Sequence, residues 1–207
     1  MAELPIVSIV DDDEQARDSL ASVIRTMNLG VECYASGQAF LDNYHKTRPG
    51  CIVLDLRMPQ MSGLEVIDEL LARKIKTPII VITGHGDIPV AVMAMKRGAT
   101  DFLEKPYRSE LLMESVRRAI ELNAQICQVE AERYVLFERF ASLTPDEKNV
   151  LLLTAEGKPD KAIATRLDLS LRTVQLRRAS LMRKLSVRTR PELIRLAQIL
   201  EQSPTDG

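Results

Sequence analysis

Carboxylates, a hydroxyl and a lysine recur in this sequence at the ends of short apolar runs. Asp11-Asp12-Asp13 follows the run 5–10, Asp55 ends the run 51–55, Thr83 ends the run 78–83, and Lys105 follows the run 101–104. Neighbouring carboxylates repel one another and take up protons unless a cation neutralises them. Oxygen ligands suit Mg²⁺, and an aspartate can act as a nucleophile that forms an aspartyl phosphate. A hydroxyl and an ammonium group can then hold the phosphoryl oxygens.

A simpler interpretation applies to each of these residues taken alone. An Asp that follows a strand is most often a helix cap or a solvated loop residue, and a lone Lys-Pro pair indicates nothing. Asp13 and Glu14 suit the positive N-terminus of a helix, so we favour a capping role for Asp13 over a metal-binding role. The joint occurrence of acids, hydroxyl and lysine after different apolar runs is what favours a chemical site.

The apolar runs alternate with stretches of helical spacing, which predicts repeated βα units. Strands are expected at 5–10, 31–35, 51–55, 78–83 and 101–104, and helices from residue 14, at 37–46, 63–74 and 88–97, and from residue 109. This alternation indicates a parallel sheet, here a single open, doubly wound α/β sheet of five strands. Such sheets bind ligands outside the carboxyl ends of their strands. We therefore expect the acids, Thr83 and Lys105 to converge at that edge.

Length and composition are those of a globular chain with one medium domain or two small ones. The chain has 207 residues, and its formal net charge of −1 combines unlike parts. Residues 1–124 hold 14 basic and 18 acidic residues, whereas residues 142–207 hold 12 basic and 8 acidic residues. Eight of those 12 basic residues lie between Arg166 and Arg190. This asymmetry indicates a different partner for each half.

Several classes of protein are disfavoured by simple features. No run approaches the ~18 apolar residues of a membrane span, and the first residues do not have the basic and apolar regions of a signal peptide. The three cysteines have no C-x-x-C spacing, which argues against a disulfide framework and against a thiolate metal site. We expect a cytoplasmic protein that does not associate with a membrane.

The central stretch from Ser109 to about Ala141 contains no Gly and no Pro. It exceeds the ordinary helix of about 11–12 residues, and two interpretations remain open. One is a single continuous helix that joins two domains, which we favour and which could pair with a second copy as a short coiled coil. The other is a shorter helix followed by a partly helical linker.

The C-terminal part predicts four helices, of which the third is strongly basic. Thr144-Pro145-Asp146-Glu147 is typical of a capped helix start, and further helices are expected near 160–167, at 171–185 and from 189. The helix at 171–185 contains no acids that could pair with its arginines at i,i+4 spacing. A helix, a short turn and a basic helix are what the major groove of DNA accepts. A solvated cationic helix face is the common alternative.

The N-terminal part resembles the receiver domain of two-component response regulators over about residues 4–122. The resemblance rests on Val10-Asp11-Asp12, Asp55 with Met58-Pro59 and Met61-Ser62-Gly63, Thr83-Gly84-His85-Gly86, and Lys105-Pro106. It implies that Asp55 is the phosphoacceptor, and that Asp11, Asp12, Asp55 and the backbone carbonyl of Arg57 hold Mg²⁺. It also implies that Thr83 and Lys105 bind the phosphoryl group, that Phe102 is the switch aromatic, and that a histidine kinase is the partner.

The C-terminal part resembles the LuxR/NarL-type four-helix DNA-binding domain. The residues that carry this resemblance are Leu143-Thr144-Pro145-Asp146-Glu147, Val150-Leu151, Gly157, Lys161, Ile163-Ala164, Leu167, Ser170, Arg172-Thr173-Val174, Met182, Lys184-Leu185 and Glu192-Leu193. By resemblance, bases face Gln175, Leu176 and Ala179, whereas phosphates or groove edges of double-stranded DNA contact Arg172, Thr173, Arg177, Arg178, Arg183 and Lys184. The family often has Asn where this chain has Asp160 and His where it has Arg177. Two further arginines beside Gln175 leave the base-reading set open.

Together, the two halves identify the chain as similar to FixJ/NarL-type response regulators, with a linker helix like that of StyR-like members. This implies an α/β, flavodoxin-like receiver at 1–122, a helical linker at 123–141, and an all-α LuxR-type helix-turn-helix domain at 142–207. It implies a transcription regulator rather than an enzyme, in which phosphorylation of Asp55 promotes homodimerisation and DNA binding. Two alternatives remain. An aspartyl-phosphate phosphohydrolase is disfavoured by Arg57, which stands where a second catalytic Asp is needed. A phospho-signalling adaptor would bind protein or RNA.

Overall fold

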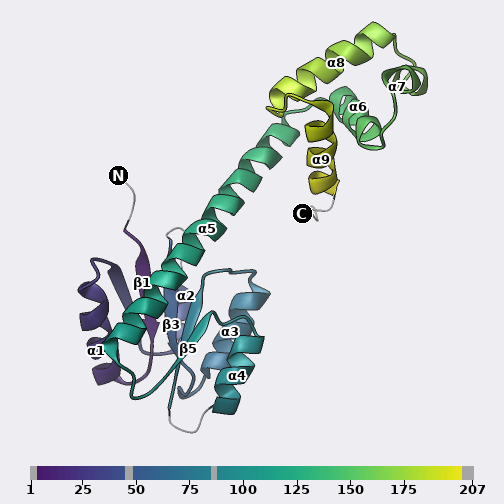
Figure 1. Ribbon diagram of the computed structural model, residues 1–207. Coiled ribbons are helices and arrows are strands. Elements are labelled where there is room, and N and C mark those ends of the chain that lie inside the picture. The colour runs from purple at the N-terminus through teal and green to yellow at the C-terminus, as the bar shows by residue number, and fades with distance from the viewer. Residues whose placement is uncertain (1–3, 45–48, 85–87, 202–207) are drawn as a thin grey trace. The chain divides into compact units, whose positions relative to one another are not determined.

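The computed structural model describes residues 4–44, 49–84 and 88–201 of the chain (Figure 1). The chain divides into two compact units, Met1–Val129 and Glu130–Gly207. The strands are β1 (Ile6–Val10), β2 (Gly30–Tyr34), β3 (Gly50–Asp55), β4 (Ile79–Thr83) and β5 (Asp101–Glu104). The helices are α1 (Glu14–Arg25), α2 (Gly37–Asn43), α3 (Gly63–Ala72), α4 (Ile88–Lys96), α5 (Ser109–Ala141), α6 (Pro145–Ala155), α7 (Asp160–Arg166), α8 (Leu171–Lys184) and α9 (Arg190–Glu201). No helix in the described part of the chain is both long and apolar enough to cross a membrane.

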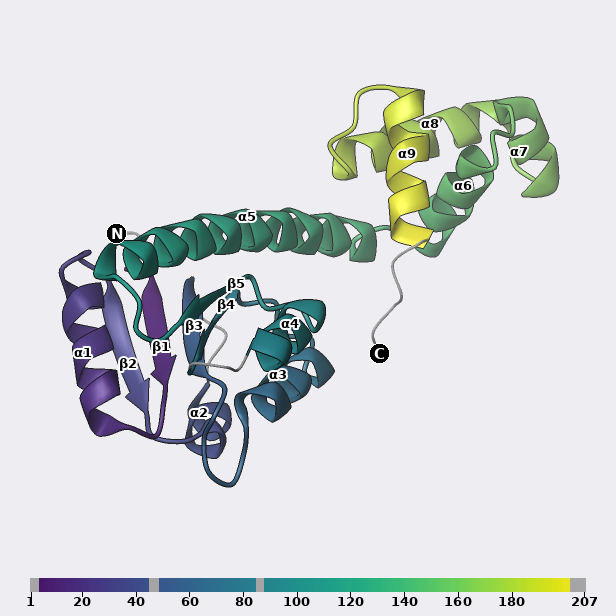
Figure 2. The same cartoon turned by 60° about the horizontal axis from the view of Figure 1, so that its bottom comes forward.

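The first unit is built on one parallel sheet with the strand order β2-β1-β3-β4-β5. Helices α1 and α5 cover one face of the sheet, and α2, α3 and α4 cover the other (Figure 2). Because both faces are covered, the central strands β3 and β4 are buried at every position, as their continuous apolar runs predict. The expected five-stranded α/β sheet is confirmed, and every strand begins and ends within one residue of its expected bounds.

The long helix α5 is continuous from Ser109 to Ala141, as we favoured from the sequence. Its first part packs on the sheet through Leu112, Val116 and Ala119. Asn123 follows on the same face; it is buried, and its side-chain oxygen accepts a hydrogen bond from the amide of Gly50 at 2.9 Å. The expected receiver boundary after residue 122 therefore lies within the packed part of α5.

The second unit packs α6, α7, α8 and α9 around a separate apolar core. Thr144 caps α6 in a capping box with Glu147, and Pro145 occupies the first turn, as the sequence predicts. Phe140, in the last turn of α5, packs against the same core. The expected four-helix domain is therefore present, and its core includes the end of the preceding helix.

Candidate functional site

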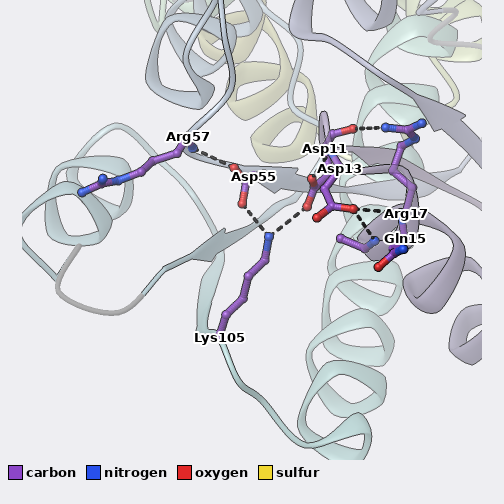
Figure 3. A network of polar contacts seen from close by, with 8 residues as sticks. Asp11, Asp13, Gln15, Arg17, Asp55, Arg57 and Lys105 are labelled. Carbon is purple, nitrogen blue, oxygen red and sulfur yellow. Dashed lines mark hydrogen bonds and ion pairs between the residues drawn. The ribbon is translucent and has the colours of Figure 1, made fainter.

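Asp11 and Asp55 meet one lysine at the carboxyl ends of the central strands. Strands β1 and β3 pair in parallel with Val10 opposite Leu54, so the next residue of each strand emerges at the same edge. Lys105 Nζ donates to Asp11 Oδ2 at 3.0 Å and to Asp55 Oδ1 at 2.9 Å (Figure 3). Both carboxylates are buried, whereas the lysine is partly exposed. The structure thus brings together three of the residues that the sequence singled out.

Hydrogen bonds hold the loop after β1 in place. Asp13 caps α1, because its side chain accepts from the amides of Gln15 at 2.8 Å and Ala16 at 3.2 Å; the expected capping role is confirmed. The Asp13 amide donates to Asp11 Oδ1 at 2.9 Å, and Arg17 Nη1 donates to the Asp11 carbonyl at 2.7 Å (Figure 3). Sequence reasoning missed Arg17. Its position four residues after the cap, about one helical turn, is the signal that could have found it.

The second oxygen of Asp55 is held by the loop that follows β3. The Arg57 amide donates to Asp55 Oδ2 at 2.8 Å, and the Gly63 amide donates to the Leu56 carbonyl at 3.1 Å. A Cβ atom on Gly63 would lie 2.4 Å from the Asp55 carbonyl oxygen, so the loop can approach this closely only with glycine there. Arg57 therefore orients Asp55 through its amide. The metal-binding role expected for its carbonyl stays a prediction.

Burial and the lysine act in opposite directions on the Asp55 carboxyl group. Burial raises the pKa of Asp55, the hydrogen bond and charge of Lys105 lower it, and the net direction is upward. Burial lowers the pKa of Lys105, but the hydrogen bonds and charges of Asp55 and Asp11 outweigh burial and raise it to about 12. Lys105 is therefore protonated at neutral pH and neutralises two carboxylates that would otherwise repel each other.

Thr83 and Phe102 lie on the two strands next to this cluster. Thr83 is buried at the end of β4, and its carbonyl accepts from the Lys105 amide at 2.8 Å. Its hydroxyl donates to the Gly84 carbonyl at 3.3 Å. Phe102 lies in β5 opposite Val81, and 44% of its surface is exposed. The Thr83 backbone is thus paired with that of Lys105, its hydroxyl bonds to the next residue, and the Phe102 side chain is exposed.

Lys105 brings together Asp11 and Asp55, two of the three carboxylates expected to hold Mg²⁺, and the role of Asp12 stays a prediction. The Asp12 side chain is exposed, and within the described ranges no group of three Asp, Glu, His or Cys side chains is placed to hold a metal ion. Mg²⁺ needs only one or two protein carboxylates when water and phosphate oxygens complete its shell. Asp11 and Asp55 fit that donor set. His85, part of the motif that begins at Thr83, lies outside the described residues.

In the second unit, α7, a short turn and α8 form the expected helix-turn-helix. Asp168 adopts a left-handed backbone conformation in the turn, with φ of 51°, which Asp tolerates better than most residues. Ser170 then caps α8, since its hydroxyl accepts from the Thr173 amide at 3.0 Å. Val174 and Leu181 are buried in the core. Of the residues expected to contact DNA, Thr173 is half-buried and the exposed ones are Arg172, Gln175, Leu176, Ala179 and Arg183.

The other three expected DNA contacts are ion-paired within the unit. Arg177 Nη2 lies 2.6 Å from Asp146 Oδ2, and Arg178 Nη1 pairs with Asp160 Oδ1. Lys184 Nζ lies 2.7 Å from Glu147 Oε2. The sequence shows no acids at i,i+4 spacing within α8, but the fold supplies partners for these cations from α6 and α7. The basic cluster is therefore partly neutralised.

Glu147 connects α6 to the C-terminal half of α8. It is buried and accepts from Lys184 Nζ at 2.7 Å, the Thr144 amide at 2.8 Å and the Ser180 hydroxyl at 2.8 Å. Burial alone would raise the pKa of Glu147, but these hydrogen bonds outweigh it and lower the pKa to about 2. The sequence identified Glu147 only as part of a capping box, because its contacts with Ser180 and Lys184 exist only after packing.

Both units match known families. Residues 7–117 match the family model described as "Response regulator receiver domain", and residues 141–197 match "Bacterial regulatory proteins, luxR family". The chain is 41% identical over 206 residues to "Transcriptional regulatory protein FixJ" of Azorhizobium caulinodans, covering 100% of this chain and 98% of that protein. It is 39% identical over 198 residues to "Response regulator protein TodT" of Pseudomonas putida, covering 96% of this chain and 87% of that protein.

Solved structures agree with this similarity. The response regulator StyR matches with a TM-score of 0.83 at 38% identity, covering 95% of this chain and 100% of that one. Full-length FixJ from B. japonicum matches with a TM-score of 0.59 at 36% identity, covering 98% and 100%. The α/β receiver and the helical LuxR-type domain expected from the sequence are both confirmed.

Proposed function

The chain belongs to the two-component transcriptional response regulators, and within that family we propose that Asp55 is the phosphoacceptor. An Asp55 oxygen attacks the phosphorus of a phosphohistidine on a partner histidine kinase. The new O–P bond forms as the N–P bond breaks, and the departing imidazole nitrogen takes up a proton. The observation that carries this proposal is the position of Asp55, a buried carboxylate at a strand end with Lys105 on one oxygen and the Arg57 amide on the other.

The groups around Asp55 suit the charge that phosphorylation adds, about −1.5 to −2 at neutral pH. The Lys105 ammonium pairs with a phosphoryl oxygen, and the Thr83 hydroxyl donates to another. Asp11 and Asp12, with Asp55 and the Arg57 carbonyl, would hold Mg²⁺. The bound ion would supply positive charge to the phosphoryl oxygens.

Phosphorylation is then transmitted to the α4-β5-α5 surface and promotes a homodimer. Thr83 moves toward the phosphoryl group, and the exposed Phe102 ring turns inward after it. The surface that responds carries exposed apolar side chains, including Val92 of α4, Phe102 of β5 and Leu111 of α5. Burying such side chains against a second copy stabilises a dimer, and two linked recognition helices raise the affinity for a DNA site that holds both.

Double-stranded DNA is the proposed partner of the second unit. Helix α8 enters the major groove, where Gln175, Leu176 and Ala179 face bases. Phosphates and groove edges are contacted by Arg172, Thr173, Arg177, Arg178, Arg183 and Lys184. Three of these side chains are ion-paired to carboxylates in the free protein: Arg177, Arg178 and Lys184. On binding, each exchanges its carboxylate for a DNA phosphate or contacts both.

We place this activity in the cytoplasm and assign no catalytic turnover of an external substrate. Cys33, Cys51 and Cys127 are free thiols, and free thiols persist in a reducing compartment. The relatives named above are regulators, and the phosphoryl group on Asp55 is a signal rather than an intermediate of a reaction on an organic phosphate.

The assignment of Asp55 is tested by phosphorylation with acetyl phosphate and Mg²⁺. Asp55→Asn removes the nucleophilic oxygen, so the mass increase of one phosphoryl group and the phosphorylation-dependent gain in DNA binding should both disappear. Asp42→Asn, a change at an exposed position of α2, is the matched control and should retain both. Labelling of Asp55→Asn at the wild-type level would show that another residue accepts the phosphoryl group.

A further inference from the structure

Helix α8 presents one exposed face that is basic at its ends and neutral in its centre. Arg172, Leu176, Ala179 and Arg183 follow one another at spacings of four, three and four residues, and all four are exposed. This spacing places them along one side of the helix. The opposite side carries the buried Val174 and packs into the core of the second unit.

The centre of this face is apolar in a helix that is otherwise rich in arginine. Leu176 is 63% exposed, which is the largest exposed fraction among the leucines of the described residues. Ala179 lies one turn further on the same side, and the exposed Gln175 directly precedes Leu176 in the chain. Leu176 thus lies between the exposed Arg172 and Arg183 on the face of α8 that points away from the core.

The charges around this centre are arranged to meet phosphates on either side. Arg172 and Arg183 form no ion pair within the described part of the chain. Arg177 and Arg178 are instead directed to carboxylates of α6 and α7. The guanidinium groups beside the apolar centre are therefore held away from it, and the free ones lie at its two ends.

From this arrangement, and resting on the proposed DNA-binding function, we propose that α8 recognises thymine methyl groups through Leu176 and Ala179. The C5-methyl group of thymine is the apolar group that the major groove displays, and Gln is suited to bind adenine through N6 and N7. Leu176 and Ala179 are separated by about 4.5 Å along the helix, so both reach the same short stretch of the groove. The two side chains therefore contact neighbouring base pairs, and Gln175 binds an adenine next to them.

A half-site is the stretch of DNA that one copy of α8 contacts. The centre of each half-site should contain A·T pairs whose thymine methyl groups point toward Leu176. G·C pairs are recognised mainly by Arg or Lys on guanine, and the centre of this face presents neither residue. If arginines of α8 contacted the bases, as the composition of the helix alone suggests, guanine would instead be expected at the centre of the half-site.

The test begins with full-length protein, phosphorylated with acetyl phosphate and Mg²⁺, and a pool of randomised DNA duplexes. Each thymine of the selected duplex is then replaced in turn by deoxyuridine, which lacks only the methyl group. Loss of one buried methyl should weaken binding by about fourfold at one or two adjacent positions in each half-site. Leu176→Ala should weaken binding to the thymine duplex and should no longer distinguish thymine from deoxyuridine at those positions.

The matched control is Leu152→Ala, which truncates an exposed leucine of α6 and should keep the full sensitivity to deoxyuridine. Because Leu176 is exposed, its variant should also keep the wild-type melting temperature. A selected site without methyl-sensitive thymines, or sensitivity that persists in Leu176→Ala, overturns the inference and leaves DNA binding intact. Failure of the protein to select any duplex sequence overturns the proposed DNA-binding function, and the inference with it.

Discussion

Lys105 decides the electrostatics of the acidic cluster. Its ammonium group is shared between Asp11 and Asp55, two carboxylates that are 2% and 7% exposed. Without a cation, these buried carboxylates would repel each other and one of them would take up a proton. Lys105 therefore stabilises the fold, in addition to its proposed role of binding the phosphoryl group.

Lys105→Met should lower the stability of the first unit in the absence of metal. It leaves two buried carboxylates without their cation, which should cost about 1–3 kcal/mol of unfolding free energy. Saturating Mg²⁺ should restore part of this loss, because a bound cation replaces the missing charge. Urea denaturation with and without Mg²⁺ measures both effects. The control is Lys96→Met, at an exposed lysine of α4, and an equal loss there would contradict the assignment.

In the second unit, Glu147 is a charged side chain that pairs with more than one polar group, as Lys105 does in the first unit's acidic cluster. Its carboxylate receives hydrogen bonds from Thr144, Ser180 and Lys184, and its pKa falls from 4.5 to about 2. Because the pKa is lower in the folded state, ionised Glu147 stabilises the fold at every pH above 4.5. This stabilisation is lost as the pH falls from about 4.5 toward about 2.

The Glu147→Gln variant should therefore be less stable than the wild type at neutral pH. Its stability should also decrease less than that of the wild type when the pH is lowered. The expected loss at pH 7 is about 2 kcal/mol, typical of hydrogen bonds to a charged group. The melting temperature of a fragment of residues 130–207, measured from pH 7 to pH 3, tests both expectations. Glu156→Gln, at an exposed position directly after α6, should follow the wild-type curve. Parallel curves for wild type and Glu147→Gln would show that Glu147 does not titrate in this range.

At the scale of elements, the part of α5 that packs on the sheet extends further along the helix than its apolar residues indicate. Asn123 accepts from the Gly50 amide at the start of β3. Gly50 leaves no room for a side chain, because a Cβ atom there would lie 1.8 Å from the Ile6 carbonyl oxygen. We propose that the receiver ends at Val129, where the contacts divide, rather than after residue 122.

Asn123→Ala should destabilise the first unit by about 1–3 kcal/mol, because it leaves the buried Gly50 amide without an acceptor. For the same reason, a fragment of residues 1–122 should be less stable than one of residues 1–129. Chemical denaturation of both fragments and of the variant provides the comparison. Ala124→Gly, an exposed change on the same helix, controls for helix propensity and should cost about 1 kcal/mol. Equal stability of the two fragments would place the boundary before Asn123.

At the scale of the whole molecule, two units with separate cores carry opposite charges. Residues 1–129 hold 14 basic and 18 acidic residues, and residues 130–207 hold 14 and 11. The net charges of −4 and +3 sum to the −1 of the chain. The negative unit contains the proposed Mg²⁺ and phosphoryl site, and the positive unit is the proposed DNA-binding unit. A near-neutral total thus says nothing about either partner.

Calorimetry of the full chain should show two thermal transitions, one for each core. A ligand that binds only the folded form raises the melting temperature of the unit that binds it. Beryllofluoride with Mg²⁺, a phosphoryl mimic, should raise the transition of the 1–129 unit, and a selected DNA duplex should raise that of the 130–207 unit. Asp55→Asn should abolish only the first response. A single transition that shifts with either ligand would refute the separation into two units.

Local patterns in the sequence were sufficient to predict the helices and strands, the fold class and the residues of the acidic cluster. Apolar runs and helical spacing depend on neighbours along the chain, and so do caps such as Asp13 and Thr144. The parallel alternation of strands and helices also places Asp11, Asp55 and Lys105 at one edge, since the ends of parallel strands must meet there.

Only the tertiary structure decided which charged and polar groups pair with one another. Arg17 on the Asp11 carbonyl, Asn123 on the Gly50 amide, and the carboxylates on Arg177 and Arg178 join separate elements or loops. Such pairings depend on helix orientation and side-chain direction after packing, which no spacing along the chain specifies. By sequence, α8 is a basic helix. In the structure, the centre of its exposed face is apolar, because carboxylates of α6 and α7 pair with Arg177 and Arg178.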